Sequence, residues 1–212
     1  MDSTDSERVR DPADIGDFAA LRAAAEGCTR CELHRKATQT VFGQGPRGAS
    51  VALVGEQPGD QEDKAGEPFV GPAGKLLDRA LREAGIPREE VYLTNVVKHF
   101  RFEQRGKRRI HQRPRTEQVR ACRPWLDAEL RLLAPEVLVI LGATAAQALL
   151  GSSFRITKHR GEVVAWEELS LIPTVHPSAI LRTPDERRPE EFRMLVDDLT
   201  VAATELNRLR SR

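Results

Sequence analysis

Short apolar runs that alternate with helix-like segments are the feature that most constrains the fold of this chain. Four runs rich in Val, Ile and Leu have the length and composition of buried strands: 50–55, 91–97, 136–141 and 171–175. Helical spacing and end signals mark four further segments: 17–27, 72–85, 143–150 and 188–208. Strands that alternate with helices form sheets covered on both faces. We therefore predict an α/β fold, a three-layer α/β/α sandwich around a central, mostly parallel four-stranded sheet, with 162–166 as a candidate added edge strand.

The length of the chain and its first residues set the expected domain organisation. A chain of 212 residues is the size of one domain. Residues 1–16 are acidic and hold few large apolar side chains, so we expect a flexible tail there and a single domain over 17–212. No apolar run approaches the ~20 residues of a bilayer span, and the first residues lack the features of a secretory signal. These two features, together with the odd number of cysteines, three, predict a cytoplasmic protein without a membrane partner.

Positive charge is concentrated in one segment of an otherwise balanced chain. The net charge is only +1, which excludes a basic coat over the whole surface. Ten basic residues against two acidic ones between Lys98 and Pro124 give that stretch a local charge of +8. Its centre, RGKRRIHQRPR (105–115), is too polar and too rich in Gly and Pro for a core element, so we predict an exposed basic loop. Any nucleic-acid partner would bind at this local patch.

Polar residues follow three of the predicted strands at their carboxyl ends. Glu56 and Gln57 come after the first strand, Asn95 lies near the end of the second, and His176 follows the fourth. Ligands of open α/β sheets bind beyond this edge, so we expect the four to converge on a site for a polar planar ligand and for acid–base chemistry. The alternative for Asn95 and His176 is that they only cap loops. A nucleotide phosphate loop is excluded, because GEQPGDQEDKAG is acidic and lacks the required glycine and lysine pattern.

Three cysteines are candidate metal ligands. The spacing of Cys28 and Cys31 fits a zinc site, an iron–sulfur cluster or chance equally well. Cys122 lies on an apolar helical stripe, where it is either a further ligand or a small buried hydrophobe. A closed site needs a fourth ligand, for which His34 and His99 are candidates.

Several motifs of the chain resemble those of the iron–sulfur uracil-DNA glycosylases. They are GEQPG (55–59), EPFVGPAGKLLD (67–78), YLTNVVK (92–98), CRPWL (122–126), LGATAAQALLG (142–151) and TVHPS (174–178). A further motif, KRRIH (107–111), narrows the resemblance to the UdgX type, which is close to the family 4 enzymes. The resemblance implies the uracil-DNA glycosylase fold and a monomeric DNA repair enzyme. Its partner is uracil-containing DNA, single-stranded or with the base flipped out of the duplex, and its product is free uracil.

The resemblance also implies a [4Fe–4S] cluster. Family 4 proteins hold this cluster with four cysteines, the third of which follows the strand that carries the Asn. His99 occupies that position here, so the implied ligands are Cys28, Cys31, His99 and Cys122. Histidine replaces thiolate at iron in Rieske centres, which makes the exchange chemically reasonable.

Roles for the pocket residues follow from the same resemblance. Phe69 would stack on uracil, Asn95 would read its amide edge, and His176 would bind the base and stabilise its negative charge as it leaves. Glu56 would face the oxocarbenium-like sugar, with Gln57 beside the sugar and base.

A covalent step is implied by the KRRIH motif. In UdgX-type proteins the loop histidine, here His111, replaces water and bonds to C1′ of the sugar, so excision ends in a single-turnover DNA adduct. Lys107, Arg108 and Arg109 would hold the loop on DNA phosphates, and Arg182 would support the loop that meets the opened DNA. Without the resemblance, His111 is one more polar residue of a basic loop and Arg182 an ordinary surface arginine.

Two other functions stay open on the sequence. The first is a conventional, multiple-turnover family 4-like glycosylase, in which water completes the reaction. The second is a zinc-containing nucleic-acid-binding module that has no catalytic activity.

Overall fold

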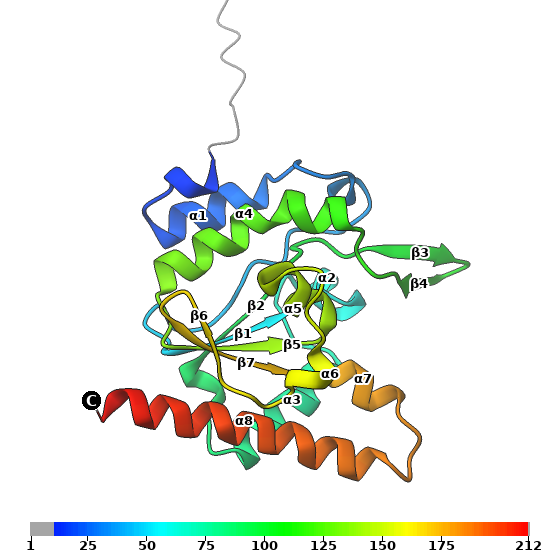
Figure 1. The fold of residues 1–212 in the computed structure, drawn as a ribbon. Coiled ribbons are helices and arrows are strands. Elements are labelled where there is room, and N and C mark those ends of the chain that lie inside the picture. Colours follow the sequence, from blue (N-terminus) through cyan, green and yellow to red (C-terminus); the bar gives the residue numbers. More distant parts are fainter. Residues whose placement is uncertain (1–10, 212) are drawn as a thin grey trace, which may run out of the picture.

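A five-stranded sheet forms the centre of residues 11–211, the part of the chain that this computed structural model describes (Figure 1). Its strands lie in the order β2 (Val91–Asn95), β1 (Val51–Gly55), β5 (Val137–Leu141), β7 (Leu169–Thr174) and β6 (Val164–Trp166). The first four are parallel, as predicted, and β6 pairs antiparallel with β7. The predicted number of four strands is wrong, because the candidate edge strand is part of the sheet. A tight turn with Glu167 at φ 51° folds β7 back against β6, so no helical crossover is needed.

Helices cover both faces of the sheet, which confirms the predicted three-layer sandwich. Successive side chains of β1 point to opposite faces, so Ala52 and Val54 lie in one half of the core and Val51 and Leu53 in the other. The first face packs against α1 (Phe18–Glu26), α4 (Thr116–Leu133) and α5 (Ala143–Leu150). The second face packs against α3 (Pro72–Glu83), α7 (Pro177–Arg182) and α8 (Arg188–Arg210). Figure 1 shows α4 and α8 on opposite sides of the strands.

The remaining helical elements are short. They are η1 (Pro12–Asp14), η2 (Glu32–Arg35), α2 (Asp60–Ala65), η3 (Arg88–Glu90) and α6 (Ile156–His159). Of these, α2 follows β1 closely and therefore starts near the carboxyl edge of the sheet. Within residues 11–211, no helix has the length and apolar character needed to cross a membrane.

Part of the predicted tail packs against the domain. Pro12 and Ile15 are buried, and Pro12 opens the short 3₁₀ helix η1. Arg131 of α4 holds this segment, because its Nη2 donates to the Ile15 carbonyl at 2.8 Å. Residues 11–16 thus belong to the packed structure, and the rest of the predicted tail, 1–10, lies outside the described residues.

The predicted basic loop is a β-hairpin instead. Strands β3 (Phe102–Arg105) and β4 (Arg108–His111) pair antiparallel, with Gly106 and Lys107 in the turn. Gly106 adopts φ 57°, a conformation that tight hairpin turns require and glycine adopts without strain. Two of the four residues in each strand are charged, so the sequence lacks the apolar alternation that marks a strand. The hairpin projects away from the central sheet, as Figure 1 shows.

Candidate functional site

Two adjoining cavities lie where the predicted site residues come together, beyond the carboxyl ends of the parallel strands. Their volumes are about 460 and 230 Å³. Both are lined by Gln57, His111, His176, Ser178 and Arg182. Glu56 lines only the larger cavity, whereas Phe69 and Asn95 line only the smaller one. The structure thus gathers the catalytic and substrate-binding residues that the sequence predicts.

Asn95, Phe69 and His176 surround one point in the smaller cavity. A Cβ atom added to Gly55 would lie 2.4 Å from Asn95 Oδ1, 2.8 Å from Phe69 Cζ and 3.4 Å from His176 Nε2. The rings of Phe69 and His176 are stacked, with centroids 5.9 Å apart and planes inclined by 26°. Phe69 has φ 58°, a strained conformation for a residue with a side chain, and such strain is frequent at ligand sites. The three side chains thus line a common slot in the smaller cavity.

Asn95 offers this slot an unpaired hydrogen-bond acceptor. Its Oδ1 is buried and accepts no hydrogen bond from residues 11–211. A buried acceptor without a donor costs roughly 1–3 kcal/mol, so a ligand that brings an N–H group relieves this cost. The side chain thus faces a ligand space rather than capping a loop.

A buried ion pair fixes the backbone of Asn95 from behind. Lys98 Nζ donates to the Asn95 carbonyl at 2.8 Å and to Thr94 Oγ1 at 2.7 Å. Both Lys98 and its ion-pair partner, Glu129 of α4, are buried. This pair could not be predicted from the sequence, because its two residues lie 31 positions apart and leave no local pattern.

His176 presents a neutral N–H donor to the slot. Its Nδ1 accepts from the Ser178 backbone N–H at 3.2 Å and lies 2.8 Å from the Ser178 hydroxyl. The proton of a neutral ring is therefore on Nε2, the atom nearest Gly55. Burial, together with smaller contributions from the charges of Arg182 and His111, lowers the pKa of His176 to about 4. The ring is uncharged at neutral pH.

Glu56 and His111 face each other at the larger cavity. Glu56 Oε1 lies 3.5 Å from His111 Nε2, and Glu56 Oε2 accepts from the Thr144 hydroxyl. Thr144 in turn accepts from Arg113 Nε at 2.9 Å. Thr144 and Arg113 are residues of the site that were not predicted from the sequence. Thr144 carries the same signal as the predicted residues, because it follows the carboxyl end of β5 just after Gly142.

Gln57 forms hydrogen bonds to the base of the hairpin and to the ring of His111. Its Oε1 accepts from the Arg101 N–H at 3.1 Å, so its amide nitrogen points to the Gln112 carbonyl at 3.0 Å and to His111 Nε2 at 2.9 Å. His111 Nε2 therefore accepts, and carries the lone pair. Burial lowers the pKa of His111, the Glu56 carboxylate opposes this, and Arg182 adds to it. A neutral His111 thus presents a nucleophilic nitrogen at the cavity.

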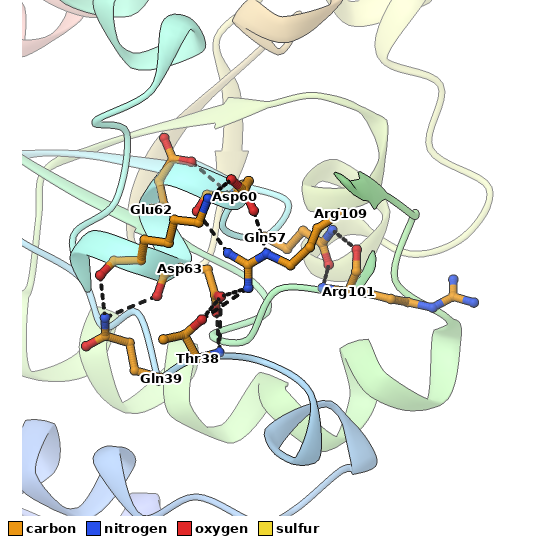
Figure 2. Close-up of polar contacts among 10 residues, drawn as sticks. Thr38, Gln39, Gln57, Asp60, Glu62, Asp63, Arg101 and Arg109 are labelled. Carbon is orange, nitrogen blue, oxygen red and sulfur yellow. Dashed lines mark hydrogen bonds and ion pairs between the residues drawn. The ribbon is translucent and has the colours of Figure 1, made fainter. Parts of the chain in front are cut away.

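The basic residues of the hairpin divide into two kinds. Lys107 and Arg108 are exposed, as residues that bind DNA phosphates must be. Arg109 is turned inward and forms ion pairs with Asp60 and Asp63 of α2 (Figure 2). Alternation along β4 directs the side chain of Arg109 to the protein, where its charge is already paired, so its contact with a DNA phosphate stays a prediction.

The predicted cluster ligands are only partly brought together. Burial raises the pKa of Cys122 to about 12, with a smaller contribution from Cys28 and Cys31, which lie close enough for their charges to interact with it. Cys122 Sγ accepts from the Lys98 N–H at 3.2 Å, a type of contact that stabilises a cluster-bound thiolate. His99 is buried and bonds through Nε2 to the Thr40 hydroxyl at 3.0 Å. Within residues 11–211, no group of three or more Cys, His, Asp or Glu side chains is arranged to hold a metal ion.

The donor chemistry around the thiols still fits an iron–sulfur group. The indole N–H of Trp125 donates to Cys28 Sγ at 3.1 Å, so two of the three sulfurs accept an N–H bond. None of the three cysteines forms a disulfide. The thiols thus match the implied group, whereas His99 has a different partner.

Comparison with known proteins agrees with the fold. The family model of the uracil DNA glycosylase superfamily matches residues 42–200. The type-4 uracil-DNA glycosylase of Thermotoga maritima is 41% identical over 177 residues, covering 82% of this chain and 87% of that protein. Those of Archaeoglobus fulgidus and Sulfurisphaera tokodaii are 38% and 36% identical, covering 77% and 79% of this chain and 83% and 78% of those proteins. The chain belongs to the uracil-DNA glycosylase superfamily.

Proposed function

We propose that this protein excises uracil from DNA and that His111 then bonds covalently to C1′ of the sugar. The observation that carries the first half is the buried, unpaired Oδ1 of Asn95, which lies beside Phe69 and His176 in the smaller cavity. The observation that supports the second half is the position of His111 Nε2, which lies at the cavity 3.5 Å from Glu56 Oε1. Uracil must enter flipped out of a duplex or in single-stranded DNA, because a stacked base cannot reach the cavity.

The slot suits uracil better than cytosine. Uracil N3–H donates to Asn95 Oδ1, and the amide N–H₂ of Asn95 donates to uracil O4. Cytosine has an unprotonated N3 and an amino group at C4, so both contacts would become repulsive. Phe69 stacks on the ring, and the Nε2–H of His176 donates to a carbonyl oxygen of the base.

Cleavage of the N-glycosidic bond separates charge between base and sugar. The bonding electron pair leaves with uracil, and the neutral N–H of His176 stabilises the resulting anion. Positive charge develops at C1′, where the Glu56 carboxylate stabilises it. The Thr144 hydroxyl keeps Glu56 in place through its donation to Oε2.

His111 then takes the place of water. Its Nε2 lone pair forms a bond to C1′, and the proton on Nδ1 is released to solvent. The product is a neutral alkylimidazole, a poor leaving group, so the adduct persists. Exposed Lys107 and Arg108 hold the DNA through its phosphates.

A conventional, multiple-turnover glycosylase is the second candidate. The matched proteins favour it, since they are named type-4 uracil-DNA glycosylases. Water would then attack C1′ and release an abasic site. The base slot has the same role in both candidates, and only the fate of C1′ differs.

Incubation with a single-stranded oligonucleotide that contains one uracil tests the proposal. We expect release of one uracil per protein and a DNA–protein species that survives heat and denaturing electrophoresis. An oligonucleotide with thymine in place of uracil is the control and should give neither. Repeated uracil release without the denaturation-resistant species would establish the second candidate instead. Absence of both would refute the proposed function.

The adduct should respond to pH differently from excision. Because the pKa of His111 lies below its ordinary value of about 6.5, the lone pair is available at neutral pH and is lost as the pH falls through that lowered pKa. His176 stays neutral to about pH 4, so its contact with the base persists. We expect the ratio of adduct to released uracil to fall once the pH drops below the lowered pKa of His111, while uracil release continues. A ratio that stays constant over the whole acidic range in which uracil is still released would contradict the assignment of His111.

We also propose an iron–sulfur cluster held by Cys28, Cys31, Cys122 and His99. Such a cluster would tie the segment around Cys28 to α4 and supply a structural cross-link. Anaerobically purified protein should contain iron and sulfide, and His99→Ala should lower the iron retained per chain. His34→Ala is the matched control and should retain iron as the wild type does. Stoichiometric zinc without iron would refute the cluster and point to the zinc-binding module.

A further inference from the structure

Arg109 is the one member of the KRRIH segment whose charge is fully engaged by the protein. Its side chain is 15% exposed, between the exposed Arg108 and Ile110. Arg109 Nε lies 2.5 Å from Asp60 Oδ1, and Nη1 lies 2.6 Å from Asp63 Oδ2. In Figure 2 the guanidinium points into the space between these two carboxylates.

The acceptors of Arg109 are themselves anchored. Asp63 is fully buried and accepts from Thr38, through the backbone N–H at 3.0 Å and the hydroxyl at 2.6 Å. The other guanidinium contacts are Nη1 to Thr38 Oγ1 at 3.1 Å and Nη2 to the Asp60 carbonyl at 3.2 Å. Freeing Arg109 to bind a phosphate would leave the buried carboxylate of Asp63 without its cation, which is strongly unfavourable.

The anchored residue lies two positions before His111 on the same strand. Side chains two apart on a strand share a face, so Arg109 and His111 are directed to the same side of the hairpin. Beneath the guanidinium, the rings of Phe100 and Phe102 lie 5.5 and 5.0 Å from its central carbon. Gln57 fixes the base of the hairpin, and Arg109 fixes β4 directly beside His111.

We propose that Arg109 is a positioning residue, which holds His111 over the cavity through Asp60 and Asp63 and thereby decides whether His111 or water captures C1′. This inference rests on the proposed function. After the glycosidic bond breaks, imidazole attack gives the adduct, whereas water attack gives an abasic site and a proton. A nitrogen held at contact distance outcompetes water because its effective concentration is high. A hairpin released from α2 loses this advantage and admits water.

Three variants separate positioning from DNA binding. Arg109→Gln removes the positive charge and the guanidinium N–H donors. It should lower the fraction of cleaved sites that become adduct by about tenfold, while single-turnover uracil release continues. Arg109→Lys keeps the charge but reaches only one carboxylate, so it should give an intermediate fraction. Arg108→Gln is the control for lost charge. It should weaken DNA binding and reduce its salt dependence, without lowering the adduct fraction at saturating protein.

Hydrogen exchange of the hairpin amides gives a readout that does not depend on the adduct. Exchange over 102–111 should be faster in Arg109→Gln than in the wild type, and unchanged in Arg108→Gln. The inference is overturned if Arg109→Gln keeps the wild-type adduct fraction, or if it lowers the salt dependence of binding as Arg108→Gln does. A wild type that forms no adduct would refute the proposed function instead, and hydrogen exchange alone would then decide whether Arg109 orders the hairpin.

Discussion

Replacement of Asn95 by alanine will lower uracil excision by roughly 10²- to 10³-fold, the loss measured when one preorganised hydrogen-bonding group is removed from an active site. The variant loses both the acceptor for N3–H and the donor for O4, and retains Phe69 and His176 around the base. The measurement is the single-turnover rate of uracil release from single-stranded DNA.

Stability and DNA affinity are the controls for this variant. Asn95 Oδ1 is buried and has no hydrogen-bond donor among the described residues of the free protein. Its removal therefore also removes the free-energy cost of a buried, unpaired acceptor. Asn95→Ala should therefore unfold at the same temperature as the wild type or at a higher one, and bind uracil-free DNA equally well. A wild-type rate of uracil release would remove Asn95 from the site.

Replacement of His111 by glycine will abolish the covalent adduct while uracil is still released. Excision depends on Asn95, His176 and Glu56, all of which stay in place, and water can enter the space that the imidazole leaves. The variant should become a multiple-turnover enzyme. Denaturing electrophoresis and free-uracil assays on the same samples measure the two outcomes together.

His111→Ser is the variant to compare with His111→Gly, because it keeps a small polar side chain at position 111. Its hydroxyl is a weak nucleophile without an activating base, so it should also release uracil without forming the adduct. If His111→Gly still gave a denaturation-resistant DNA adduct, the nucleophile would be another residue.

The sheet and the pocket could be predicted because each depends on local sequence. Short apolar runs that end in Gly55 and Gly142 mark β1 and β5 without reference to distant residues. The rule that ligands bind at the carboxyl ends of parallel strands then brings Asn95 and His176 together. Thr144 obeys the same rule, and a systematic use of strand ends would have included it.

The hairpin and its anchoring could not be predicted, because they depend on contacts between distant segments. The register that pairs Phe102 with His111 gives no apolar alternation, since both strands carry charged residues. The carboxylates that pair with Arg109 lie on α2, and Asp63 is 46 positions away from Arg109 in the sequence. The KRRIH resemblance therefore implied the same role for Arg108 and Arg109, and only the packed structure distinguishes the two side chains.

The most direct test of the covalent assignment is to locate the bond itself. Wild-type protein is incubated with uracil-containing single-stranded DNA, the product is digested with nuclease and protease, and the peptides are sequenced by mass spectrometry. We predict that a deoxyribose-derived mass is attached to His111 and to no other residue. Attachment at another side chain, or the absence of any modified peptide while uracil is released, would contradict the account.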